Sequence, residues 1–219
     1  MDRWATFDCY GTLIDREGGI GAALGELWPK ADRDALLARF HDVEPALQAD
    51  GSRSYRQVLS AAVPAVAEAE GLAVPDGGVP ALAASLPSWP PFPEVAEALG
   101  ELKDRGWRIA ILSNTDPDFL DASLAAIGVP VDLRVVASVI GSYKPAVEHW
   151  ESFFRLTGAD RSHHVHVAAS LFHDVEPCAA LGLPCVWINR LGEVSPVPRA
   201  GEAQDLRGLA VVLDELVPA

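Results

Sequence analysis

The chain has 219 residues, of which 49% are hydrophobic and 22% charged, and its formal net charge at pH 7 is −14. This is the composition of a globular protein, and the surplus of acidic groups argues against nucleic acid or an anionic membrane surface as a partner. No apolar run approaches the roughly 20 residues that a membrane span requires, and no secretory leader is recognisable.

The first predicted element is a buried strand from Trp4 to Phe7, followed directly by Asp8-Cys9-Tyr10-Gly11-Thr12. A short apolar run is typical of parallel sheets, whose strands are covered on both faces. Asp8 then lies at the carboxyl end of the strand, where open α/β sheets bind ligands. A carboxylate at this place can act as a covalent nucleophile, although in isolation such a residue more often caps the next turn.

The segment 15–91 contains helix patterns and no convincing strand. Residues 15–29 are interpreted as a mixed segment, whose beginning is loosened by Gly18, Gly19 and Gly21. Asp32 and Ser54 are predicted to cap two helices, and Gly71 to end the second. Pro64 lies inside the second pattern and predicts a kink or a break.

Residues 87–93 contain four prolines, which can neither continue a helix nor join a central strand. We interpret this stretch as a return linker. Residues 15–91 then form a helical cap domain with its linker, inserted after the first strand, and residues 1–14 and 92–219 form one catalytic core.

Beyond the linker, strands and helices alternate as they do in βαβ units. Strands are predicted over 107–112, 135–139, 165–168 and 185–188, and the stretch 190–204 is predicted to be a loop. The expected fold is therefore an α/β core with a parallel sheet.

Polar residues follow these strands or open the next helix: Ser113, Asn114, Lys144, Ser170 and Asp174. Each has an ordinary alternative, as a helix cap or as a surface lysine. The carboxyl ends of parallel strands meet at one edge of a sheet, so these side chains are expected to lie together with those that follow the first strand. The whole set in this order is difficult to reach by chance.

On these four segments the chain resembles the haloacid dehalogenase superfamily, and within it the type II 2-haloacid dehalogenases. The resemblance implies a Rossmann-like core under a cap domain that encloses a small anionic substrate. It implies that Asp8 displaces halide from a 2-haloacid to form an ester, which water then hydrolyses. Asp174 would orient or deprotonate this water, Lys144 would keep Asp8 ionised, and Thr12 would hydrogen-bond the nucleophile.

The resemblance also suggests residues that contact the substrate carboxylate or the halide: Tyr10, Arg39, Ser113, Asn114 and Ser170. Arg39 is chosen because related enzymes place an arginine of the cap near the halide, and its alternative is a helix arginine that faces solvent. His173 could help to activate water, although a packing or capping role is commoner. His163, His164 and His166 are interpreted as structural or exposed.

Two positions distinguish this chain from phosphatases of the same superfamily. Tyr10 stands where they carry a second acid, and Ala169 where their fourth segment begins with one. A Mg²⁺ ion needs several carboxylates, and only Asp8 and Asp174 remain, so no metal and no cofactor is expected. The alternatives are a Mg²⁺-dependent phosphatase and a non-catalytic member that binds a small acid or a partner protein.

The three cysteines, Cys9, Cys178 and Cys185, are odd in number and lie in apolar surroundings, which favours reduced thiols in the cytoplasm. A homodimer is compatible with the resemblance, because cap and core surfaces pair in such proteins.

Overall fold

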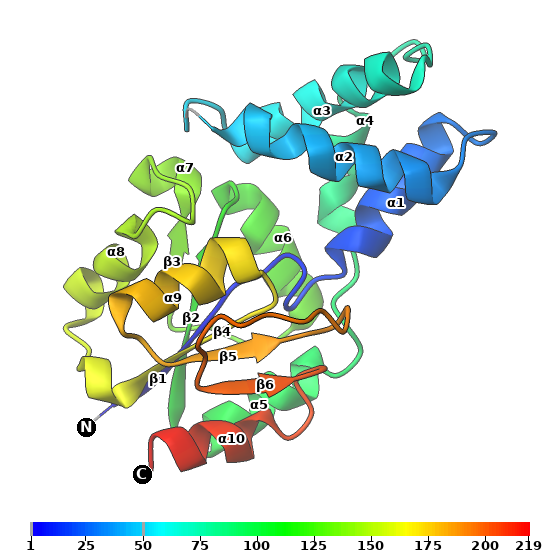
Figure 1. Ribbon diagram of the computed structural model, residues 1–219. Helices are drawn as coiled ribbons and strands as arrows, with labels where there is room; N and C mark the ends of the chain where they lie inside the picture. The colour runs from blue at the N-terminus through cyan, green and yellow to red at the C-terminus, as the bar shows by residue number, and fades with distance from the viewer. Residues whose placement is uncertain (1, 50) are drawn as a thin grey trace.

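The computed structural model describes residues 2–49 and 51–219, and its centre is a six-stranded parallel sheet (Figure 1). The strands are β1 Arg3–Phe7, β2 Trp107–Ser113, β3 Leu133–Val136, β4 His164–Ala168, β5 Cys185–Ile188 and β6 Gly201–Ala203. They lie in the order β3-β2-β1-β4-β5-β6. This is a Rossmann-like order, so the predicted fold class is confirmed. The order reverses between β1 and β4, which is where such sheets bind ligands.

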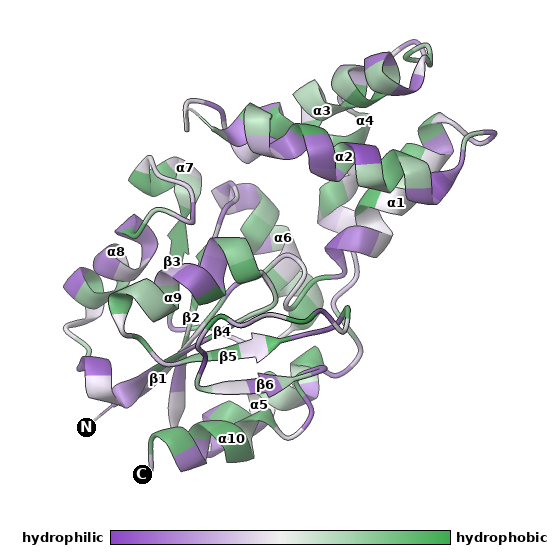
Figure 2. Cartoon of the chain, viewed as in Figure 1, coloured by the Kyte–Doolittle hydropathy of each residue, from purple (hydrophilic) through white to green (hydrophobic). Residues whose placement is uncertain are grey.

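Helices cover both faces of the sheet. On one face α5 Val95–Asp104, α6 Pro117–Ile127 and α10 Leu209–Leu216 share a buried cluster with Ala5 and Phe7 of β1. On the other, α8 Glu148–Thr157 and α9 Glu176–Leu181 pack with Trp4, and the short α7 Ala137–Ile140 follows β3. Figure 2 shows that α10 is mostly hydrophobic. Leu209, Ala210 and Leu213 of this helix are buried in the cluster that it shares with β1, α5 and α6.

The remaining helices form a second group, called here the helical group: α1 Arg16–Leu27, α2 Arg33–Gln48, α3 Tyr55–Glu70, α4 Ala81–Ser85 and a 3₁₀ turn, Leu86–Ser88. Figure 1 shows it standing apart from the sheet layers. The chain enters and leaves the group side by side, since Ile14 forms a β-bridge with Pro91 and the Asp15 amide donates to the Pro90 carbonyl at 2.9 Å.

Contacts from the core also hold the helical group over the carboxyl edge of the sheet. The Asp116 carboxylate, after β2, accepts hydrogen bonds from the Tyr55 and Arg56 amides at 3.2 and 2.9 Å, at the start of α3. The Tyr143 hydroxyl donates to the Arg53 carbonyl at 2.8 Å. The first N–H groups of α3, which have no partner within the helix, are thereby satisfied by a core residue.

The helix caps of the helical group lie where the sequence predicts them. Asp32 accepts from the Asp34 and Ala35 amides, and Ser54 forms a reciprocal capping box with Gln57. Gly71 ends α3 in the left-handed conformation. Of the kink or break predicted at Pro64, the break is wrong, because α3 runs without interruption through this residue. Pro64 lies on the exposed side of the helix.

The segment 15–29, predicted to be mixed, is more regular than expected, because most of it forms helix α1. Asp15 caps this helix by accepting from the Gly18 amide. The glycines serve packing: a Cβ built on Gly19 would lie 2.4 Å from ring atoms of Trp89. Gly19, one of the glycines that loosen the sequence pattern, therefore lets Trp89 of the linker approach the backbone of α1.

Two predicted strand regions also differ from the structure. β3 ends at Val136, and the residues predicted to complete it turn into α7. The predicted loop 190–204 contains the edge strand β6, which pairs with β5 through only three residues. Gly201-Glu202-Ala203 has neither β-branched nor aromatic side chains, so β6 carries no local strand signal.

Candidate active site

An acid–lysine–acid chain forms the floor of the site. The Lys144 ammonium donates to Asp8 Oδ1 at 2.8 Å, to Asp174 Oδ1 at 2.7 Å and to the Leu112 carbonyl at 2.9 Å. Thr12 Oγ1 donates to Asp8 Oδ2 at 2.8 Å and accepts from the Ala169 amide at 2.9 Å. The sheet edge thus brings the four predicted catalytic residues into direct contact.

Burial and charge act against each other in this chain. Burial alone disfavours the charged form of Lys144, but the carboxylates of Asp174 and Asp8 outweigh it and raise the pKa of Lys144 above its ordinary value. Burial would likewise raise the pKa of Asp174, yet the Lys144 charge and a hydrogen bond from His166 lower it. Lys144 and Asp174 are therefore both ionised at neutral pH.

The loops after β2 and β4 supply further polar groups. Asn114 is locked to Lys144 by two hydrogen bonds, from its Nδ2 to the Lys144 carbonyl at 2.9 Å and from the Lys144 amide to its Oδ1 at 2.7 Å. Ser170 caps the π-helical turn Leu171–Val175 by accepting from the His173 amide at 3.1 Å. Ser113 Oγ is buried and finds no hydrogen-bond partner within the described residues.

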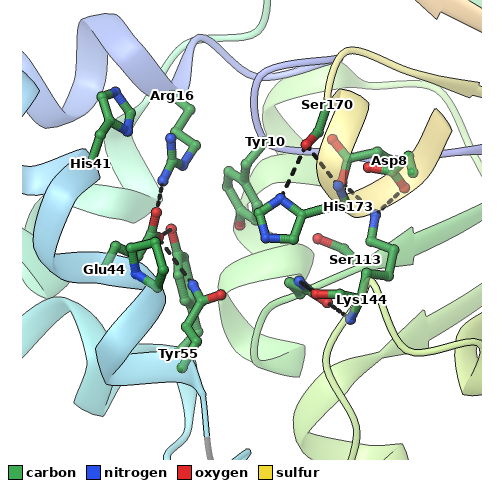
Figure 3. A pocket seen from close by; sticks show the side chains of 14 residues that line it. Asp8, Tyr10, Arg16, His41, Glu44, Tyr55, Ser113, Lys144, Ser170 and His173 are labelled. Carbon is green, nitrogen blue, oxygen red and sulfur yellow. Dashed lines mark hydrogen bonds and ion pairs between the residues drawn. The ribbon is translucent and has the colours of Figure 1, made fainter. Parts of the chain in front are cut away.

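These groups line one wall of a cavity of about 290 Å³ between the sheet edge and the helical group. The facing wall carries Arg16, His41, Glu44, Gln48 and Tyr55, as Figure 3 shows for the four that it labels there. Tyr10 also lines the cavity. Its hydroxyl lies 3.1 Å from Ser123 Oγ, and burial raises its pKa.

The facing wall is built around an ion pair between Arg16 and Glu44. Arg16 also contacts Glu17 at 3.0 Å, while Glu44 accepts from Gln48 at 3.1 Å and from the Tyr55 hydroxyl at 3.3 Å. Sequence reasoning missed this wall. The lining residues of α2 at 41, 44, 45 and 48 have the spacing of one helix face, but only the packing of the helices shows that this face meets the cavity.

Arg39 does not lie in the cavity wall. Its guanidinium pairs with Glu70 and Asp42, both at 2.9 Å, and its side chain is 39% exposed. The reason is helix periodicity: residue 39 is two positions before His41, which turns it about 200° away from the lining face of α2. Among the described lining residues, Arg16 of α1 is the arginine.

The residues around Asp8 do not fit a metal ion well. Within residues 2–49 and 51–219 no group of three or more His, Cys, Asp and Glu side chains could hold one. The Lys144 ammonium already lies between Asp8 and Asp174, the two carboxylates that a cation would bridge. The residues around Asp8 therefore provide no suitable ligand set for a metal ion.

Fold and site together define an α/β enzyme with an aspartate at the carboxyl edge of its sheet. A family model described as haloacid dehalogenase-like hydrolase matches residues 3–182. The chain is 31% identical to an (S)-2-haloacid dehalogenase of Pseudomonas sp. strain YL over 194 residues, 86% of this chain and 83% of that protein. The chain therefore belongs to the haloacid dehalogenase-like hydrolase family.

Two further proteins show how far this likeness extends. A haloacetate dehalogenase of Moraxella sp. strain B is 28% identical, covering 85% of each chain. The structure of an L-2-haloacid dehalogenase from Xanthobacter autotrophicus with chloropropionic acid covalently bound superposes with a TM-score of 0.83. At 19% identity, over 97% of this chain and 98% of that one, it shows the shared fold.

Proposed function

We propose that this protein is a hydrolytic dehalogenase that displaces halide from a small 2-haloacid through an ester on Asp8, without a metal ion or cofactor. The observation that carries the proposal is the Lys144 ammonium held between Asp8 and Asp174 at the cavity floor. The likeness to the (S)-2-haloacid dehalogenase supports the substrate class.

In the first half-reaction, an Asp8 oxygen attacks the carbon that bears the halogen. A carbon–oxygen bond forms, the carbon–halogen bond breaks, and the halide leaves with the electron pair. No proton is needed by the leaving group, so a tyrosine suffices at position 10. Lys144 and Thr12 each donate to one Asp8 oxygen and so orient the carboxylate for the attack.

In the second half-reaction, water attacks the ester carbonyl carbon of Asp8. Lys144 and Thr12 are placed to stabilise negative charge on the Asp8 oxygens as it develops. Asp174 accepts the proton of the water and returns it to the oxygen of the departing 2-hydroxy acid. Its Oδ2 is suited to this role, since it is buried with no partner among the described residues.

The substrate itself would lie between the two walls of the cavity. We assign Ser113, Asn114, Ser170 and Tyr10 to its carboxylate or halide, and Arg16 takes the place that the sequence suggested for Arg39. The cavity volume of about 290 Å³ suits a small acid. We further propose that residues 15–91 act as the cap domain, since both of its connections to the core run side by side.

The proposal also covers the location of the protein and its assembly. None of the helices in the described part combines the length and apolar character that a membrane span requires. We propose a cytoplasmic location, which the buried free thiols Cys9, Cys178 and Cys185 favour. A homodimer remains part of the proposal through the resemblance alone.

The decisive experiment measures halide release from both enantiomers of 2-chloropropanoate with EDTA present, for the wild type and Asp8→Asn. We expect release by the wild type that EDTA does not change. Asp8→Asn should lower it by about a thousandfold or more, the scale on which enzymes lose rate without their nucleophile. Mg²⁺-dependent phosphate release from a phosphate ester, with no halide release, would instead establish the phosphatase alternative.

A further inference from the structure

A buried polar chain lies directly beneath the site, on the α8 and α9 face of the sheet. His166 Nε2 is 2.9 Å from Asp174 Oδ1, and His166 Nδ1 is 2.8 Å from Thr6 Oγ1. The same hydroxyl lies 2.8 Å from His164 Nε2. All three residues are fully buried, beside the apolar cluster that α8 and α9 form with the sheet. Their contacts follow from the register, because Thr6 of β1 pairs with His166 of β4.

The direction of each hydrogen bond can be assigned from its partners. Asp174 is ionised, so the proton of the facing nitrogen lies on His166 Nε2. Burial lowers the pKa of His164 to about 3, so this ring is neutral. His164 Nδ1 has no partner within the described chain, which places its single proton on Nε2. His164 then donates to Thr6, Thr6 to His166, and His166 to Asp174.

The two carboxylate oxygens of Asp174 therefore have different hydrogen-bond partners. Oδ1 accepts from both Lys144 and His166, at 2.7 and 2.9 Å. Oδ2 is buried and accepts no hydrogen bond from the described residues. The His166 ring is itself held in place, since it packs edge-on against Trp150 with ring centroids 5.3 Å apart. Asp174 therefore cannot rotate without losing two donors.

We propose that His166 is a positioning residue that holds Asp174 with Oδ2 directed at the water of the second half-reaction. The inference rests on the proposed function and goes beyond it by assigning a role to a histidine that the sequence marked as structural. His166 makes no contact with Asp8 in the first half-reaction, and Lys144 keeps its bond to Asp8 without it. Loss of the His166 donor should therefore slow ester hydrolysis and spare halide displacement.

Two substitutions separate the donor from the rest of the ring. In His166→Gln the side-chain amide nitrogen reaches about as far as Nε2 and can still donate to Asp174. In His166→Asn it reaches only about as far as Nδ1, toward Thr6. Both variants keep a polar group in the same buried place, so they differ mainly in the bond under test. His163→Asn makes the same change at a neighbouring histidine that contacts Ser162 instead.

The experiment mixes each protein with excess 2-chloropropanoate, quenches at increasing times, and measures halide together with the mass of the Asp8 ester. For His166→Asn we expect a halide burst at the wild-type rate, accumulation of the ester, and steady turnover at least about tenfold lower, within the range of acid–base contributions. The burst itself reports that the variant is folded. His166→Gln and His163→Asn should show neither effect.

The pH profile of ester hydrolysis gives a second readout. A donor to a carboxylate lowers its pKa, so removal of the donor raises the pKa of Asp174 and moves the acid limb of the profile to higher pH. Besides Lys144 and Asp8, the titratable groups around Asp174 are His149, His173 and Cys178. Burial lowers the pKa of both histidines and raises that of Cys178, so these three are neutral near pH 7.

Equal ester accumulation in His166→Asn and His166→Gln would overturn the inference, as would wild-type hydrolysis by His166→Asn or loss of its halide burst. A failure of the proposed function gives a different result. In that case the wild type itself releases no halide and forms no ester, and the proposed role of His166 is then also wrong.

Discussion

At the scale of single residues, the site depends on where its cations lie. Lys144 is already shared by Asp8 and Asp174, so it has little positive charge left for an anionic substrate. Arg16 is the other cation at neutral pH among the described cavity-lining arginines and lysines, and Glu44 holds it in place. We therefore expect Arg16 to be the electrostatic partner of a carboxylate or halide on the helical side of the cavity.

Arg16→Gln should raise KM for 2-chloropropanoate by about tenfold or more, because a hydrogen bond to a charged group contributes about 1.5–3 kcal/mol. The matched control is Arg39→Gln, which removes an arginine of the same helical group that lies outside the cavity. Its KM should stay within about twofold of the wild type. Steady-state kinetics on both variants measures the difference. A larger effect at Arg39 would restore the assignment made from sequence.

At the scale of elements, the sequence predicts what local patterns determine. Five of the six strands, the caps at Asp32 and Ser54, and the four acid, lysine and threonine positions of the floor all follow from strand ends and helix periodicity. Helix α1 and strand β6 do not, because tertiary contacts decide them. The glycines of α1 lower its helix propensity, and the Trp89 ring packed against Gly19 explains one of them.

The position of Arg39 outside the cavity lining has the same origin. A residue count from the nucleophile cannot say which face of α2 meets the cavity, whereas the positions of the lining residues can. The wall also needs Arg16, which lies in a segment that was predicted to be mixed rather than a regular helix. The floor was accessible from sequence because four strand ends meet at one sheet edge, and the facing wall was not because it is set by how helices pack.

Packing at α1 leads to a prediction about stability. Gly19→Ala would place a methyl group 2.4 Å from Trp89 ring atoms and should destabilise the fold by about 1–3 kcal/mol, as overpacking does. Gly25→Ala, on the same helix, meets no atom within 4 Å. It should stabilise by about 0.5–1 kcal/mol through helix propensity alone. Urea denaturation of both variants tests this. Equal shifts of the two midpoints would show that the Trp89 contact is unimportant.

At the scale of the whole molecule, the two edges of the sheet have different tasks. The carboxyl edge carries Asp8, Lys144 and Asp174. At the amino edge Asp214 of α10 joins three elements, since it accepts from Arg3 of β1 at 2.6 Å, from Arg105 at 2.8 Å and from Trp107 of β2 at 2.9 Å. The last helix is thereby fastened to the two central strands far from the cavity.

Asp214→Asn should therefore lower stability and leave catalysis unchanged. Breaking its charged hydrogen bonds should lower the free energy of unfolding by about 1–3 kcal/mol.

The effect of Asp214→Asn should also depend on pH. Burial would raise the pKa of Asp214, but the Trp107, Arg105 and Arg3 donors lower it below the ordinary value. A carboxylate with a depressed pKa stabilises the fold above the pKa of the unfolded chain, about 3.9, and this contribution is lost as the pH falls through the folded pKa. The difference in melting temperature between wild type and variant should thus be full at pH 7 and shrink in acid below pH 4, while kcat/KM at pH 7 stays the same. A change in kcat/KM would mean that the amino edge is coupled to the site, and a melting difference independent of pH would mean that charge at Asp214 contributes nothing.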